Sequence, residues 1–226
     1  MNLVLWSTAT IATYVAARWL FLRTRVQLLH PVLVTTLLLM LIVELAGRDY
    51  AGFAEGTWWL GWILGPGVVA MAVPVYKLRA LIWRRAGVLV LVVVSTLLFS
   101  LFSTGIVLAL AGAEKELVQA LSLKNITAAV AMAIAREVHA LPTLAGVGAM
   151  FAAVLGAAIG PWVLQRAQVR DPRAVGLALG CGSHAVGTAR AFELGEEQGT
   201  FASVGLSLTT LVAAVICPPL LLWIFS

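Results

Sequence analysis

The sequence predicts an all-α polytopic membrane protein, with about seven transmembrane helices and one short re-entrant or interfacial helix in a single transmembrane domain, 1–226. The chain is 62% hydrophobic and only 11% charged, whereas soluble domains carry about 25% charged residues. Several apolar runs reach or approach the roughly 20 residues with which a helix crosses a bilayer. The charges, net +5, lie in short clusters between those runs. This pattern indicates membrane topology, and we expect no nucleic-acid partner.

Seven apolar runs give the expected transmembrane helices. They cover residues 3–22, 31–46, 58–76, 87–111, 143–165, 174–192 and 200–225. The first run has no basic residue before it and is followed by Arg23 and Arg25. We therefore expect residues 1–22 to remain as an additional N-terminal helix and not to be cleaved as a signal peptide. Because positive charges favour the inner side, the N-terminus is expected outside.

The segment 124–139 is shorter and more polar than the other apolar runs. Loop charges indicate whether it crosses the membrane. The acidic connection 114–116 is expected outside and the basic loop 166–173 inside. Both expectations hold together only if 124–139 does not cross. We therefore predict a short non-crossing helix over these residues.

This topology contains an inverted repeat, with repeat 1 at about 31–111 and repeat 2 at about 143–225. Each copy has an apolar helix, a glycine-broken helix, a charged loop and a long apolar helix, in that order. Residues 64–73 align with residues 181–190 through three small or apolar identities. The loop charges give the copies opposite orientations. Inverted repeats with paired broken helices are a recurrent plan of secondary transporters.

The two predicted breaks have features that attract anions. In the first, Pro66 stands between Gly65 and Gly67 and suits the first position of a helix because it lacks an N–H. In the second, Gly182 precedes Ser183, which is a good N-cap residue. Each break would expose backbone N–H groups and the positive end of a helix dipole, which attract carboxylates. Such irregular backbone is tolerated in a membrane only where it is buried or lines a cavity.

Polar side chains follow the second break. A continuing helix would place His184 and Thr188 on one face, with Gly187 beside them. We expect the hydroxyls of Ser183 and Thr188 to donate hydrogen bonds to the substrate carboxylate. Arg190 can bind a carboxylate through two hydrogen bonds, and His184 can bind it or carry a coupling proton. The alternatives are an Arg190 that reaches the interface or pairs with Glu193, a histidine held by packing, and a Gly187 that permits close helix contact.

Four other polar residues are further candidates. Asn125 and Thr127 either cap the short helix or line the pathway. Glu44, near the end of the second helix, is either interfacial or a proton relay. Glu193 is the remaining candidate for proton coupling.

No other chemistry competes with this interpretation. The Gly-Cys-Gly-Ser-His run lacks the glycine pattern of a nucleophile elbow, and no acid completes a Ser–His triad, so we expect no enzyme activity. The three histidines and two cysteines have no metal-ligand spacing. We expect neither a metal nor a cofactor, and we interpret Cys181 and Cys217 as small buried hydrophobes.

The pattern Ser-His-x-x-Gly-Thr-Ala-Arg-Ala at 183–191, with similar stretches at 64–76, 124–144 and 170–201, resembles the LrgB/CidB family. Two residues depart from the family pattern: Ala129 stands where a proline is usual, and Ala185 where a glycine is usual. Both changes favour a straighter, stiffer helix.

The resemblance implies two versions of function. Some members are holin-like or antiholin-like proteins that modulate murein hydrolase activity and autolysis with a smaller LrgA/CidA-type membrane partner. Plastid relatives resemble glycolate/glycerate translocators. We expect a secondary transporter of small monocarboxylate anions such as glycolate, glycerate, lactate or pyruvate, because a holin needs no polar broken-helix pair. We also expect a homo-oligomer, such as a dimer, in the lipid bilayer of a bacterial cytoplasmic (inner) membrane.

Overall fold

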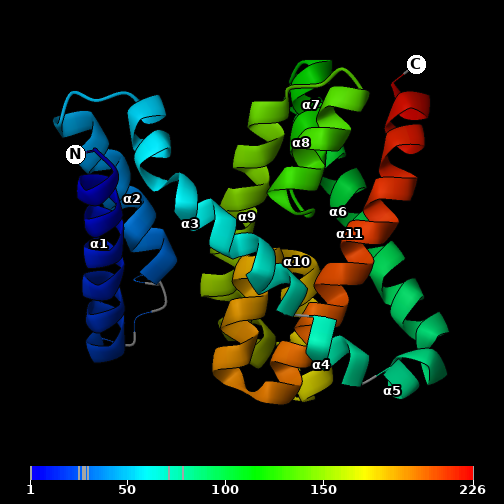
Figure 1. The fold of residues 1–226 in the computed structure, drawn as a ribbon. Coiled ribbons are helices and arrows are strands. Elements are labelled where there is room, and N and C mark those ends of the chain that lie inside the picture. Colours follow the sequence, from blue (N-terminus) through cyan, green and yellow to red (C-terminus); the bar gives the residue numbers. More distant parts are fainter. Residues whose placement is uncertain are drawn as a thin grey trace. The chain divides into compact units, whose positions relative to one another are not determined.

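In the computed structural model, every regular element within the described residues is helical (Figure 1). The described residues are 2–24, 26, 29, 31–70, 72–77 and 79–225. The helices are α1 (Asn2–Thr24), α2 (Pro31–Leu45), α3 (Tyr50–Ala70), α4 (Ala72–Lys77), α5 (Arg79–Arg84), α6 (Ala86–Leu110), α7 (Lys115–Ser122), α8 (Ala128–Glu137), α9 (Pro142–Arg166), α10 (Pro172–Leu194) and α11 (Glu196–Ile224).

Six of the seven expected transmembrane runs overlap one helix each, namely α1, α2, α6, α9, α10 and α11, and the run 58–76 is divided between α3 and α4. The largest difference is at α3, which begins at Tyr50 and not at residue 58. Asp49 accepts a hydrogen bond from the Gly52 N–H at 3.2 Å and so caps this earlier start. Within the described residues, α6, α9 and α11 are long and apolar enough to cross a membrane. The chain is therefore an integral membrane protein, while the total of seven crossings stays a prediction.

The segment 124–139 is not helical throughout. It contains most of a turn followed by α8, and together with α7 it forms a helical hairpin. The sequence did not predict α7, which comes before it, and α8 covers only ten residues. The turn at 123–127 separates the two helices because Leu123 and Ile126 are both buried there, at 0% and 1% exposed. Ten helical residues span about 15 Å, half of the hydrocarbon thickness. This length supports the prediction that α8 does not cross the membrane.

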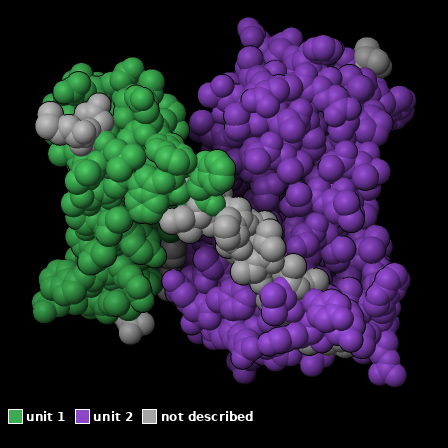
Figure 2. Space-filling view, in the orientation of Figure 1, with its two compact units in different colours: residues 1–72 green, residues 73–226 purple. Residues whose placement is uncertain are grey.

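The chain forms two compact units, residues 1–72 and residues 73–226, and each is described by itself (Figure 2). In the first unit α1 packs against α2 and α3. Ser7 Oγ donates a hydrogen bond to the Gly56 carbonyl at 3.1 Å and accepts one from Trp59 Nε1 at 2.7 Å. These paired bonds join α1 to α3 at a buried point.

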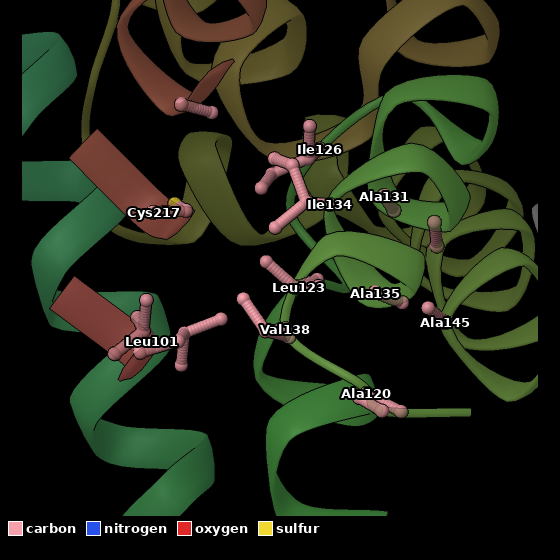
Figure 3. Close-up of a cluster of buried hydrophobic side chains, with 14 of the residues drawn as sticks. Leu101, Ala120, Leu123, Ile126, Ala131, Ile134, Ala135, Val138, Ala145 and Cys217 are labelled. Atoms are coloured by element: carbon pink, nitrogen blue, oxygen red, sulfur yellow. The ribbon is translucent and has the colours of Figure 1, made fainter. Parts of the chain in front are cut away.

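The second unit has its main apolar core where the α7–α8 hairpin meets α6, α9 and α11 (Figure 3). Leu101 of α6, Ala145 of α9 and Cys217 of α11 lie in this core with the two buried residues of the α7–α8 turn. Because both of those turn side chains are anchored in the core, the turn has a fixed position between the surrounding helices.

Helix α10 packs closely along α11 through small residues. A Cβ atom at Gly176 would lie 2.3 Å from the carbonyl oxygen of Gln198, and one at Gly180 would lie 2.1 Å from the carbonyl oxygen of Ala202. Only glycine permits the two backbones to approach so closely. This contact positions the first half of α10, which leads to the site described next.

Candidate functional site

Helix α10 is interrupted at His184, which has φ 49° and ψ −133°. This conformation is outside the helical region, and a residue with a side chain adopts it only under strain. The sequence placed a glycine-broken helix here, and the break is present, but it falls on the histidine and not on Gly182 or Ser183. The second half of α10 therefore begins after His184, and Ser183 is the last residue of the first half.

Two glycines allow the break to be packed tightly. A Cβ atom at Gly187 would lie 2.3 Å from the Leu179 carbonyl oxygen and 2.4 Å from Ser183 Cβ. A Cβ atom at Gly156 of α9 would lie 2.0 Å from Ser183 Oγ. Gly187 therefore has the close-packing role that the sequence left open. Gly182 differs from both, because a Cβ atom there would meet nothing within 4 Å.

The hydroxyl of Thr188 is used within the break. Its Oγ1 donates a hydrogen bond to the His184 carbonyl at 2.8 Å, and the residue is 0% exposed. This bond ties the second half of α10 to the strained residue. The donor that we expected Thr188 to offer to a substrate is therefore engaged inside the protein.

His184 is 3% exposed, and its ring lies beside the main chain of Lys124. Within the described residues neither ring nitrogen makes a hydrogen bond of normal geometry. Buried polar groups normally have partners, so an imidazole of this kind is unusual. The α10 break and the α7–α8 turn thus meet at this ring.

Lys124 is a residue of this site that the sequence reasoning did not assign. Its Nζ donates hydrogen bonds to Thr104 Oγ1 at 2.7 Å and to Ser100 Oγ at 3.0 Å, both on α6. It also lies 3.4 Å from Asn125 Oδ1. All three acceptors are neutral. Partial burial lowers the pKa of the Lys124 ammonium from its ordinary value.

A sequence signal for Lys124 does exist. It is the only charged residue between Glu116 and Arg136, in a stretch that otherwise reads as apolar helix and turn. A single charge in such a stretch is a functional candidate.

The two other candidates in the hairpin lie close to Lys124 in the chain. The side-chain oxygen of Asn125 faces the Lys124 ammonium. This position favours the pathway-lining alternative over the capping of α8. Thr127 occupies the N-cap position of α8, but its side chain makes no capping hydrogen bond. The capping role offered for these residues is therefore not observed.

Arg190 forms an ion pair with Glu193, with Nη1 2.6 Å from Oε2. The side chain of Arg190 is 11% exposed and that of Glu193 is 53% exposed. This pair is the alternative that the sequence offered for Arg190. Glu44 is an exposed residue one position before the end of α2, which agrees with the interfacial alternative.

The first predicted break is not observed at its expected residues. The backbone of α3 is helical through Gly65, Pro66 and Gly67 and ends at Ala70. A proline removes one N–H donor but can remain within a membrane helix when the neighbouring groups compensate. The side chains of residues 63–70 lie outside the described part of the structure. The meeting of two half-helix N-termini therefore stays a prediction.

Across the described ranges, no group of three or more His, Cys, Asp or Glu side chains is placed to hold a metal ion. Polar groups of α6 and of the α7–α8 turn come together at the Lys124 ammonium. The main chain of the same residue lies beside His184 of the α10 break.

Comparison with known proteins adds a family relationship to this geometry. The model of the LrgB-like family matches residues 10–223. The chain is 33% identical over 217 residues to the uncharacterized protein YxaC of Bacillus subtilis (strain 168), covering 96% of this chain and 94% of YxaC. It is 29% identical over 213 residues to the holin-like protein CidB of Staphylococcus aureus (strain Mu50 / ATCC 700699), covering 94% of this chain and 93% of CidB. No solved structure gives a match. The chain therefore belongs to the LrgB-like family.

Proposed function

We propose that this protein is a secondary transporter of small monocarboxylate anions, of the glycolate, glycerate, lactate or pyruvate class. The observation that supports this most is the interruption of α10 at His184, inside a packed apolar unit. Irregular backbone at such depth is costly and is found where it serves a substrate or ion pathway. A strained histidine at the break is difficult to explain as packing alone.

The residues of the break have distinct roles in this proposal. The N–H groups at the start of the second half of α10 face a carboxylate with a positive dipole end. Gly182, with open space where its side chain would be, lets the anion approach the backbone. His184 binds the anion or carries the coupling proton. Glu193 and Glu44 remain the other candidates for proton coupling.

The remaining topology belongs to the same proposal. The N-terminus lies outside, α8 does not cross, and repeats 31–111 and 143–225 are inverted in a bacterial cytoplasmic membrane. Gly65, Pro66 and Gly67 contribute the second half of the anion site, and alternating access moves one repeat against the other. The protein acts as a homo-oligomer.

Uptake into proteoliposomes tests this function. Purified protein is reconstituted and offered a panel of labelled glycolate, glycerate, lactate and pyruvate, with acetamide as a neutral control. We expect saturable uptake of at least one acid and none of the amide. Absence of uptake for the whole panel, in a preparation shown to be folded, contradicts the proposal. Flux that never saturates would indicate a passive channel instead.

A second candidate function comes from the relative named holin-like protein CidB. In that function the chain regulates murein hydrolase activity and autolysis, together with a small LrgA/CidA-type membrane partner. It predicts that bulky substitutions on lipid-facing stripes alter lysis more than His184→Ala does. The transport function predicts the reverse order. A lysis assay in cells that carry each variant, at matched membrane levels, distinguishes the two.

A further inference from the structure

Lys124 is held in one place by its neighbours in the chain. Leu123 and Ile126 are buried in the core of residues 73–226, at 0% and 1% exposed (Figure 3). Because both anchors are fixed, the turn between α7 and α8 cannot swing Lys124 away from α6. The ammonium is therefore a positioned charge, unlike that of a surface lysine on a mobile loop.

The neighbours of this charge are all neutral. Two serine or threonine hydroxyls of α6 and one amide oxygen accept its hydrogen bonds. The two ion pairs among the described residues, Arg173–Glu197 and Arg190–Glu193, do not include it. A partly buried ammonium with only neutral acceptors gains considerably from an anionic partner, because the surrounding medium screens charge poorly. The site therefore has an unbalanced positive charge.

A second observation places the turn that carries this charge at the α10 break. His184 is 97% buried, because only 3% of its surface is exposed. Its ring lies against the main chain of Lys124. Within the described part of the chain, neither ring nitrogen makes a hydrogen bond of normal geometry. An imidazole can donate to a carboxylate or accept from a carboxylic acid. The residue that carries the ammonium thus touches the imidazole through its main chain, and the two polar groups come from different elements.

We propose that the ammonium of Lys124 binds the carboxylate of the transported anion, with Ser100 and Thr104 holding the ammonium in position. This inference rests on the proposed transport function. It assigns the main positive charge of the anion site to Lys124, in place of Arg190. Arg190 is already paired with Glu193, and it lies six residues beyond His184, about 9 Å along a helix. Lys124 is on the turn that touches the break.

Chemical protection in the wild-type protein tests the proposal without any substitution. Reconstituted protein is treated with formaldehyde and a mild borane reductant, and methylation of each lysine is followed by mass spectrometry. At ten times the KM for glycolate, we expect Lys124 to react about tenfold more slowly, since about one site in eleven stays free. Lys115, an exposed lysine on the same hairpin, serves as the matched control and reacts at an unchanged rate. Glycolamide, which has no carboxylate, gives no protection.

Two results of this experiment overturn the proposal. One is an equal rate at Lys124 with and without glycolate. The other is no reaction at Lys124 at all when the reductant is ammonia borane, because a group that glycolate reaches must also be reached by formaldehyde and by ammonia borane, neither of which is larger than glycolate. If wild-type protein takes up glycolate but shows either result, the transport function stands and the role of Lys124 is wrong. If glycolate protects Lys124 but no acid is taken up, the assignment of an anion site to Lys124 stands and the proposed transport function is wrong.

Substitution gives a second, kinetic test. Lys124→Gln removes the charge but keeps a hydrogen-bond donor, and we expect the KM for glycolate to rise about ten- to a hundredfold, the loss of one charge-assisted hydrogen bond. Lys124→Arg retains the charge and should recover most of that loss. Lys115→Gln should leave KM unchanged. A purely structural tether predicts a lower thermal midpoint for Lys124→Gln with no change in KM.

Discussion

At His184 the backbone has φ 49° and ψ −133°, a region that glycine enters with the least strain. In a continuous helix, replacing alanine by glycine lowers the free energy of unfolding by about 1 kcal/mol. At this break the order should invert, because only glycine relieves the strain, which is about 1–3 kcal/mol for other residues. We therefore expect His184→Gly to be more stable than His184→Ala by about 1 kcal/mol. Equilibrium unfolding in mixed detergent micelles measures the difference.

Ala178, an exposed residue in the first half of α10, provides the control for this comparison. There Ala178→Gly should lower the free energy of unfolding by about 1 kcal/mol, as in any regular helix. If His184→Gly were instead less stable than His184→Ala, the backbone at residue 184 would be helical and the break would not exist.

The glycines on either side of the break should differ in their response to a methyl group. Gly187→Ala would bring Cβ to 2.3 Å from the Leu179 carbonyl oxygen, and we expect it to cost about 1–3 kcal/mol of stability through overpacking. Gly182→Ala meets open space and should be neutral or slightly stabilising, because it restricts the unfolded chain. The same unfolding titration checks both. Equal effects of the two substitutions would contradict the packing described for the break.

At the scale of elements, the long apolar runs were predictable because hydrophobic length determines transmembrane helices. The break in α10 was predictable too, since glycines and polar residues stand out in an apolar helix. The residue that breaks was not predictable, because the position of the break depends on how Gly156 and Gly187 pack around the preceding Ser183. The hairpin was missed for a similar reason. Leu123 and Ile126 look helical in sequence, and only tertiary burial turns the chain there.

The junction of α1 and α3 offers a test within residues 1–72. Ser7→Ala removes the partner of Trp59 Nε1 and of the Gly56 carbonyl, so we expect a loss of about 1–3 kcal/mol. Thr10→Ala removes only a bond to the carbonyl of Trp6 within α1, and it should change stability by less than about 0.5 kcal/mol. Thermal unfolding in detergent compares the two. An equal response would mean that the Ser7–Trp59 bond does not join the helices.

At the scale of the whole molecule, the prediction that α8 does not cross determines which loops share a side. We expect a cysteine at Glu114 to react with a membrane-impermeant maleimide in intact cells, and one at Ala167 to react only after permeabilisation. Both positions are exposed, while the native Cys181 and Cys217 are buried. Labelling of both positions from the same side would show that residues 115–137 cross the membrane.

Uptake of labelled glycolate by proteoliposomes that contain wild-type protein or His184→Ala, matched for folded protein, tests the central claim most directly. If the α10 break is the anion pathway, wild-type uptake saturates and the variant loses at least about tenfold in uptake efficiency, the value of one strong hydrogen bond to a charged group. Equal uptake by both proteins, or no saturable uptake by folded wild-type protein, would contradict it.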